Sequence, residues 1–159
     1  MVNRTPRTPI TPQETADRLA IRELFDAYAH CADRRDAKGQ QSLFTTNTKF
    51  SVFMAGPGSE PSYVLTGAES LAPVFADLNK YDATTHFNGQ QTVTFTAEGK
   101  ATGESYTIAH HLYKEGGKRK IMVASLRYLD VFEKVGDLWF FAERELVLDW
   151  AEVRDCAAE

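Results

Sequence analysis

The chain has 159 residues, of which 43% are hydrophobic and 25% charged, so it suits one folded domain and excludes a disordered chain or a fibre. A formal net charge of −4 offers no basic field for nucleic acid or an anionic membrane, and we expect neither as a partner. The two cysteines, Cys31 and Cys156, suggest neither a disulfide framework nor a zinc site. The first ten residues lack the apolar core of a signal peptide, which favours a cytoplasmic protein.

The first predicted element is a long amphipathic helix. It opens at Thr11-Pro12, where threonine is a good N-cap, proline suits the first helical position, and Glu14 would complete a capping box. Apolar residues then recur at intervals of three and four, and the helix is expected to end near residues 33–35. A second, shorter helix is predicted over residues 36–44. The apolar face of the first helix comprises Ile21, Leu24, Phe25, Tyr28, Ala29 and Ala32.

The rest of the chain is dominated by strand patterns. Two strands joined by a turn rich in Gly, Pro and Ser are followed by a third helix and then by four long strands in a meander. Helices gathered on one side of a mainly antiparallel sheet make an α+β domain. The predicted strands are residues 48–54, 62–66, 87–96, 103–113, 121–132 and 138–147, and the third helix is residues 69–81.

Long strands of this kind twist and coil, so the sheet should curve around an apolar hollow that suits a small ligand. We therefore expect a cone-shaped α+β barrel, in which a curved mixed sheet, mainly antiparallel, is wrapped by three helices. This domain is assigned residues 11–152, with tails over residues 1–10 and 153–159.

Three polar residues stand where apolar ones are expected, although burying an unpaired charge is costly. Asp33 continues the core-facing row of the first helix at four-residue steps, and Arg144 interrupts the apolar row formed by alternate residues of the last strand. His86 opens the first long strand, at the rim of any hollow that the sheet encloses. Each has a structural explanation as well: Asp33 could cap the second helix, Arg144 could pair with a surface acid, and His86 could be a hydrogen-bonded structural residue.

In the order of these residues the chain resembles the SnoaL-like branch of the nuclear transport factor two-like superfamily. The likeness is greatest to the group of scytalone dehydratase, bile-acid 7-alpha-dehydratase and hexachlorocyclohexane dehydrochlorinase, and it covers residues 16–150. It is carried by the helix over residues 21–33, by Thr85-His86-Phe87-Asn88-Gly89 and by the pattern over residues 132–141.

The resemblance implies roles for several residues. His86 matches the catalytic histidine of these enzymes, and Asp33 matches the aspartate that pairs with it. Arg144 matches an arginine that assists an anionic leaving group, and Tyr28 matches a pocket tyrosine. His111 falls at the position of a second active-site histidine.

Substrate contacts are expected from His111, Phe25 and Tyr128. Tyr128 lies where scytalone dehydratase carries groups that bind its substrate ring, so none of the known substrates can be transferred to this chain. Strand alternation would send His110, not His111, to the apolar side. We favour His111, since a bulge would reconcile the alternation with the resemblance.

These residues suggest a cofactor-independent lyase that performs a dehydratase-type elimination on a small apolar or polycyclic molecule. His86 would be the general base, because the reference pKa of histidine lies near neutrality, and Asp33 would orient it. A polyketide cyclase or an isomerase could use the same proton abstraction. A non-catalytic ligand-binding module, or one like a dioxygenase small subunit, is the alternative of a different class.

The remaining expectations concern partners and cofactors. Trp139, Phe141 and Val147 would lie on the outer face of the last strand, which favours a homo-oligomer, either a trimer or a dimer. Trp139 could instead pack within the cone. The proposed elimination needs no cofactor, and no nucleotide is expected, because phosphate-binding glycine loops are missing. No metal site is predicted, since the adjacent His110 and His111 point to opposite faces of a strand.

Overall fold

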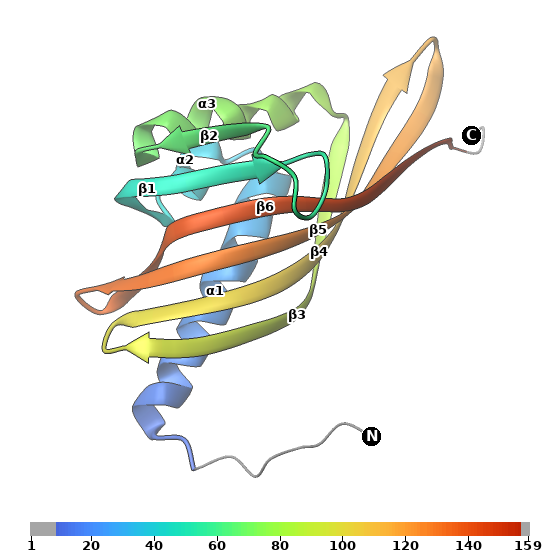
Figure 1. Cartoon of the computed structure of the whole chain (residues 1–159). Coiled ribbons are helices and arrows are strands. Elements are labelled where there is room, and N and C mark those ends of the chain that lie inside the picture. The colour runs from blue at the N-terminus through green and yellow to red at the C-terminus, as the bar shows by residue number, and fades with distance from the viewer. Residues whose placement is uncertain (1–8, 157–159) are drawn as a thin grey trace.

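The computed structural model describes residues 9–156 and confirms the predicted α+β class (Figure 1). Six strands form one sheet in the order β2-β1-β6-β5-β4-β3, with β1 parallel to β6 and the other neighbours antiparallel. The sheet is curved and open, and α1 crosses its concave side (Figure 1). The elements are α1 Pro12–Arg34, α2 Ala37–Gln41, β1 Phe44–Phe53, β2 Tyr63–Thr66, η1 Ala68–Ser70, α3 Leu71–Phe75, η2 Ala76–Lys80, β3 Ala83–Ala97, β4 Lys100–Glu115, β5 Lys118–Val135 and β6 Leu138–Asp155.

Helix α1 forms where the sequence predicts it. The Thr11 hydroxyl caps its first turn by accepting a hydrogen bond of 3.0 Å from the backbone N–H of Glu14. The predicted capping box is only half formed among the described residues, because the Glu14 carboxylate turns to Arg18 at 2.7 Å. The helix ends at Arg34 and is capped by Arg35, whose backbone adopts a left-handed conformation with φ of 63°.

The other two predicted helices differ in extent. The second is shorter than residues 36–44, because Phe44 already begins β1. In place of a continuous third helix over residues 69–81, two 3₁₀ segments flank the short helix α3. Pro73 lies inside this stretch and cannot donate the backbone hydrogen bond that a regular helix needs.

The four long strands extend beyond their predicted ends. Because β3 begins at Ala83, His86 lies inside the strand and not at its opening. Strand β6 continues to Asp155, into the segment that we expected to be a tail. The predicted N-terminal tail falls largely outside the described residues. Gly99 and Gly136 have φ of 65° and 61°, which accounts for glycine at these two hairpin turns.

A register shift in β6 overturns the predicted orientation of two aromatic residues. The pairing of β5 with β6 slips between Val131 and Phe132, the position of a β-bulge. Trp139 and Phe141, which uninterrupted alternation placed on the outer face, are therefore buried together with Arg144. Of the predicted outer apolar residues, Val147 remains on the face opposite to this row.

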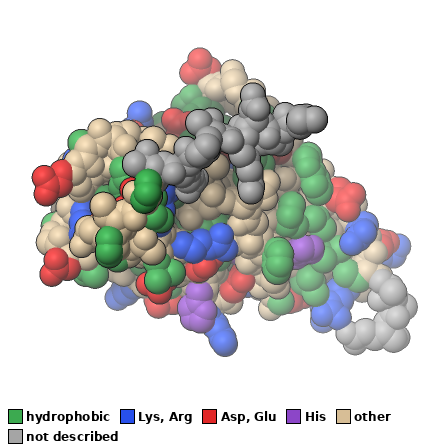
Figure 2. Space-filling model, turned by 90° about the horizontal axis from the view of Figure 1, so that it is seen from below, with side chains coloured by type: hydrophobic (Ala, Val, Ile, Leu, Met, Phe, Trp, Pro, Cys, Tyr) green, Lys and Arg blue, Asp and Glu red, His purple; other side chains and the backbone are tan. Residues whose placement is uncertain are grey.

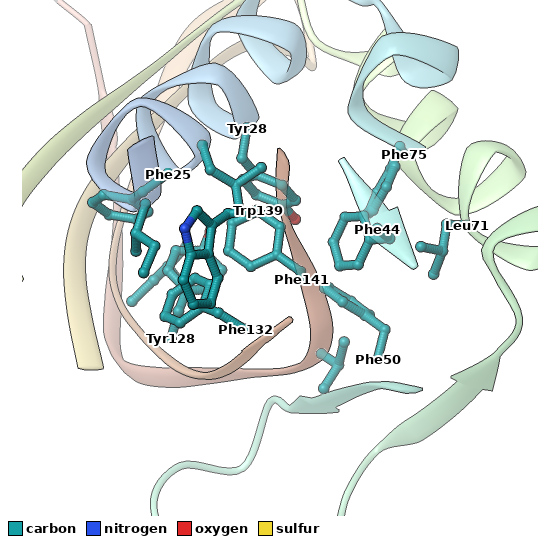
Figure 3. Close-up of a cluster of buried hydrophobic side chains, with 14 of the residues drawn as sticks. Phe25, Tyr28, Phe44, Phe50, Leu71, Phe75, Tyr128, Phe132, Trp139 and Phe141 are labelled. Carbon is teal, nitrogen blue, oxygen red and sulfur yellow. The ribbon is translucent and has the colours of Figure 1, made fainter. Parts of the chain in front are cut away.

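An aromatic core fills the space between α1 and the sheet (Figure 3). Tyr28 of α1 lies at its centre, with ring centroids 5.7 Å from both Phe75 and Tyr128 and 6.0 Å from both Phe44 and Phe141. These edge-on arrangements are the geometry that aromatic pairs prefer. The core thus fixes the position of α1, and with it every side chain that the helix contributes to the site.

The surface carries charged side chains of both signs. They lie between groups of hydrophobic side chains in the view from below (Figure 2). Among the described residues no helix is long and apolar enough to cross a membrane.

Candidate functional site

A cavity of about 280 Å³ opens between the helices and the concave face of the sheet. Its wall is mainly apolar and aromatic, which suits a small apolar molecule. Two histidines, His86 from β3 and His111 from β4, lie in this wall and supply its imidazole groups. The other aromatic lining residues are Tyr28, Phe50, Tyr63, Phe75, Tyr81 and Tyr128.

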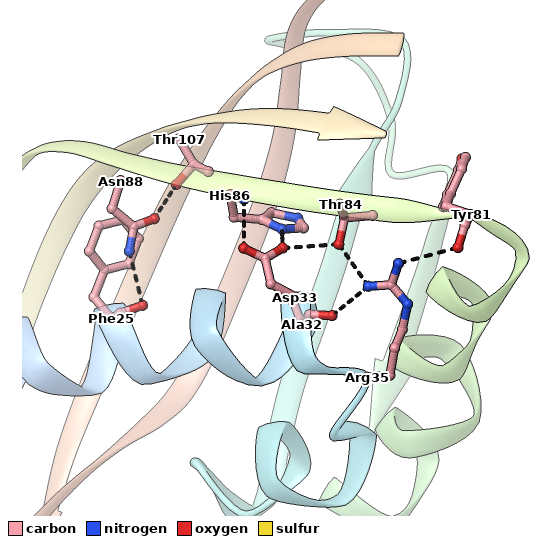
Figure 4. A network of polar contacts seen from close by, with 9 residues as sticks. All are labelled: Phe25, Ala32, Asp33, Arg35, Tyr81, Thr84, His86, Asn88 and Thr107. Carbon is pink, nitrogen blue, oxygen red and sulfur yellow. Dashed lines mark hydrogen bonds and ion pairs between the residues drawn. The ribbon is translucent and has the colours of Figure 1, made fainter. Parts of the chain in front are cut away.

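Asp33 and His86 are in direct contact at this wall (Figure 4). The Nδ1 atom of His86 lies 2.7 Å from Oδ1 of Asp33, and the backbone N–H of His86 donates to Oδ2 at 2.9 Å. One carboxylate thus holds both the backbone and the ring of the same residue. The side chain of His86 is only 7% exposed and that of Asp33 26% exposed.

The surroundings of Asp33 keep it ionised. Burial raises the pKa of this carboxyl, but hydrogen bonds from the side chain and backbone of His86 and from Thr84 outweigh that effect and hold the pKa below its usual range. An ionised carboxylate can only accept hydrogen bonds, so Nδ1 of His86 carries the proton. The other ring nitrogen, Nε2, is then unprotonated in the neutral imidazole and available to a molecule in the cavity.

His111 stands beside His86, with ring centroids 5.7 Å apart, and its ring packs against Tyr81 at 4.7 Å. Burial, followed by the nearby charge of His86, lowers the pKa of His111 to about 4, so this imidazole is neutral at neutral pH. Its Nδ1 atom is buried without a hydrogen-bond partner among residues 9–156.

The position of His111 needs no bulge. The pairing of β3 with β4 is regular from Ala83 opposite Leu112 to Asn88 opposite Thr107. The inner face of β4 is the one with small and polar residues, whereas the larger apolar row that includes His110 lies on the opposite face. The buried residues of this inner face are Ala101, Ser105, Thr107, Ala109 and His111.

Tyr28 and Tyr128 line the cavity from α1 and β5. Burial, opposed by the nearby Arg144, raises the pKa of Tyr28 to about 12. Burial raises the pKa of Tyr128 as well, with Tyr28 as the next cause. Both phenols therefore keep their protons at neutral pH and can act as hydrogen-bond donors.

Arg144 is buried behind these tyrosines. Its guanidinium pairs with Asp130 through bonds of 2.7 and 2.9 Å, and its Cζ atom lies 4.3 Å from the ring centre of Tyr28 and 4.2 Å from that of Tyr128. The described residues that line the cavity do not include Arg144. The partner of Arg144 is thus a buried acid, not the surface acid considered from the sequence, and its charge is separated from the cavity by aromatic rings.

Phe25 also lies outside the set of described lining residues. Its ring packs edge-on against Tyr128, with centroids 6.2 Å apart. Phe25 thus contacts a residue of the cavity wall, and its predicted contact with a substrate stays a prediction.

Sequence reasoning missed three residues of this region. Thr84 precedes His86 by two positions and shares its face of β3, so strand alternation could have identified it. Asp130 similarly shares the inner face of β5 with Tyr128. Arg35, which contacts Thr84, left no signal, because its direction depends on the left-handed end of α1. Among residues 9–156, no group of three or more His, Cys, Asp or Glu side chains is arranged to hold a metal ion.

Comparison with known proteins agrees with this architecture. A family model described as the SnoaL-like domain matches residues 13–145. No curated protein matches the chain.

Solved structures with the same fold include two proteins described as lyase-type enzymes and one described as an enzyme subunit. A candidate scytalone dehydratase from Novosphingobium aromaticivorans is 21% identical, with 94% of each chain covered and a TM-score of 0.75. A hexachlorocyclohexane dehydrochlorinase of type 3 from Novosphingobium barchaimii is 17% identical, covering 92% of this chain and 94% of that one, with a TM-score of 0.70. The beta subunit of a candidate aromatic-ring-hydroxylating dioxygenase from N. aromaticivorans is 18% identical, covering 87% and 92%, with a TM-score of 0.72.

Proposed function

Since the chain belongs to the SnoaL-like domain family, within the nuclear transport factor two-like superfamily, we propose that it is a cofactor-independent lyase acting on a small apolar molecule. The observation that carries this proposal is the 2.7 Å contact between Asp33 and the imidazole of His86 at the wall of an apolar cavity. A histidine held by a partly buried carboxylate is a suitable general base near neutral pH.

In the proposed reaction, Nε2 of His86 removes a proton from a carbon beside an electron-withdrawing group. Asp33 keeps the proton of the free base on Nδ1 and stabilises the imidazolium that forms. The electron pair of the broken C–H bond forms a carbon–carbon double bond as the bond to a leaving hydroxyl breaks. The hydroxyl takes up the proton from Nε2 of the His86 imidazolium and leaves as water, which returns His86 to the neutral imidazole.

Charge that develops on the carbonyl oxygen or the leaving hydroxyl needs hydrogen-bond donors. Tyr28 and Tyr128 are protonated and lie in the cavity wall, and His111 is a neutral imidazole that can donate through one ring nitrogen. In this proposal Arg144 acts through the tyrosine rings that it stacks against, and Phe25 acts by holding Tyr128.

The proposal is tested with a panel of cyclic β-hydroxyketones, which carry both an acidic C–H bond and a hydroxyl that can leave. Deuterium uptake beside the carbonyl and alkene formation are followed by NMR in D₂O. We expect His86→Ala to lose about 10²–10⁴-fold in proton abstraction and Asp33→Asn to lose a comparable factor.

His110→Ala is the matched control, because this histidine lies on the opposite face of β4 from the cavity and should leave the rate unchanged. If correctly folded His86→Ala and Asp33→Asn proteins exchanged and dehydrated a reactive ketone as fast as the wild type, the general-base role would be wrong.

Two other functions remain candidates for specific reasons. A cyclase or isomerase starts from the same proton abstraction, and the identity of the product distinguishes these reactions from elimination. The structural likeness to a dioxygenase beta subunit favours a module without its own chemistry. In that case the chain would co-purify with a large iron–sulfur subunit, and substitution of His86 would leave the partner's activity intact.

We also propose a cytoplasmic homo-oligomer that forms through the outer face of the sheet. Apolar residues cluster on this face where β5 meets β6: Leu129 is 41% exposed and lines a shallow hollow of about 260 Å³ together with Val147 and Phe53. Patches of this kind on a sheet are typical of subunit contacts.

A further inference from the structure

Two side chains outside the cavity lining form a chain of hydrogen bonds that ends at the carboxylate of Asp33. The hydroxyl of Thr84 lies 2.9 Å from Oδ1 of Asp33, and NH1 of Arg35 lies 2.7 Å from the same hydroxyl (Figure 4). The described residues lining the cavity include neither of them. Neither side chain is therefore a candidate for contact with a bound molecule.

The chemistry of these three groups fixes the direction of each hydrogen bond. Arginine can only donate and an ionised carboxylate can only accept, whereas the threonine hydroxyl has a single hydrogen. Because Thr84 accepts from Arg35, its own hydrogen must point at Oδ1 of Asp33. That oxygen is the one bonded to Nδ1 of His86.

The direction of Arg35 is itself fixed by the backbone. Arg35 adopts the left-handed conformation that closes α1, and its NH1 also donates to the carbonyl oxygen of Ala32 at 2.9 Å. Both hydrogens of NH1 are thus donated in hydrogen bonds, one to Ala32 of α1 and one to Thr84 of β3. Left-handed conformations are unfavourable for residues with a side chain, and they persist only where the surroundings hold them.

We propose that Arg35 and Thr84 are positioning residues of the catalytic pair: Arg35 orients the Thr84 hydroxyl, and this hydroxyl holds the Asp33 carboxylate on Nδ1 of His86. The inference rests on the proposed general-base function for its catalytic meaning, but its structural content is independent of any substrate. Without the hydroxyl, the carboxylate has one hydrogen bond fewer to fix its rotation, and the tautomer of the His86 ring is held less firmly.

The test compares Thr84→Val, which keeps the shape but removes the hydroxyl, with Thr84→Ser, which keeps the hydroxyl. Carboxyl ¹³C NMR follows the titration of Asp33, and ¹⁵N NMR follows the tautomer of His86. We expect Thr84→Val to raise the pKa of Asp33, because the Thr84 hydrogen bond helps to lower it, and to populate the Nε2–H tautomer. We expect about a tenfold loss of proton abstraction with Thr84→Val and wild-type behaviour with Thr84→Ser.

Arg35→Gln is the second variant, and Arg34→Gln, an exposed neighbour with the same charge change, is its control. If Arg35 acts through Thr84, the NMR effects of Arg35→Gln should be much smaller in the Thr84→Val background than alone. A Thr84→Val protein with wild-type Asp33 titration and His86 tautomer would overturn the inference, as would identical behaviour of Thr84→Val and Thr84→Ser. The expected NMR changes together with unaffected proton abstraction in His86→Ala would support the positioning role and reject the enzyme function.

Discussion

At the scale of single residues, the two histidines of the cavity differ in what surrounds them. His86 is bonded to a carboxylate, whereas His111 packs against Tyr81 and has a buried Nδ1 without a partner among the described residues. One ring is thus set up to accept a proton, and the other is kept neutral by its apolar surroundings. Two imidazoles 5.7 Å apart can therefore serve as base and neutral hydrogen-bonding group in one cavity.

The neutral state of His111 predicts a pH dependence of stability. Its pKa falls from 6.5 to about 4 on folding, so between these values the unfolded chain binds more protons than the folded one. The contribution of His111 to stability is therefore complete above pH 6.5 and is lost as the pH falls toward 4. Between about pH 7 and pH 5, we expect the wild type to lose about 1–2 kcal/mol more of its unfolding free energy than His111→Gln.

Urea unfolding at the two pH values measures this difference, with His110→Gln as the control on the other face of β4. Equal pH dependence of the wild type and His111→Gln would show that the buried imidazole does not titrate as described.

Among single residues, the sequence predicted the pairing of Asp33 with His86 better than the roles of the residues around this pair. Asp33 and His86 could be identified by helix and strand periodicity and by a family resemblance, and they meet in the structure. The role of Thr84 was accessible from the same alternation but needed the position of Arg35 to be recognised. That position depends on one left-handed residue, which no periodic pattern reveals.

At the scale of elements, β6 and β5 bury an ion pair in the aromatic core. The side chains of Arg144 and Asp130 are 0% and 1% exposed, and the guanidinium stacks on Phe141 with its Cζ atom 3.8 Å from the ring centre. Removing one partner of such a pair leaves an uncompensated charge, whereas replacing both by apolar groups is often nearly neutral.

We therefore expect Arg144→Met to lower the unfolding free energy by about 3–5 kcal/mol, and the double variant Arg144→Met, Asp130→Leu to recover much of that loss. Chemical denaturation of the wild type, both single variants and the double variant measures the coupling between the two sites. Additive losses in the double variant would contradict a buried pair.

The elements were predictable to different degrees. Helix α1 and the meander were clear, since long periodic patterns and glycine turns defined them. The prediction that Trp139 lies on the outer face was wrong. A bulge in β6 exchanges the inward and outward faces of the strand, and the sequence pattern does not reveal it. The third helix was predicted as continuous, although Pro73 argued for an interruption.

At the scale of the whole molecule, the α+β cone was predictable because the order of helices and strands excludes other classes. The size and lining of the cavity were not, because they depend on how α1 and α3 pack over the sheet. The apolar patch on the outer face of the sheet was likewise not predictable, since residues far apart in the chain form it.

The proposed oligomer predicts a matched pair of surface variants. Leu129 lies on the outer face of the sheet beside Glu145, whereas Leu138 is 65% exposed at the start of β6. We expect Leu129→Glu to dissociate the oligomer, because a charge in an apolar contact is costly, and Leu138→Glu to leave it intact. Sedimentation equilibrium distinguishes the two, and a wild-type chain that is monomeric at all concentrations would refute the interface.

The central claim is that the imidazole of His86 is the base, and chemical rescue tests it most directly. His86→Ala leaves a space in the cavity wall beside Asp33, and free imidazole can bind there as a substitute. We predict that added imidazole restores deuterium uptake in this variant, in proportion to its unprotonated form, and restores far less in the double variant with Asp33→Asn. Full activity of His86→Ala without imidazole, on a ketone that the wild type turns over, would contradict the claim.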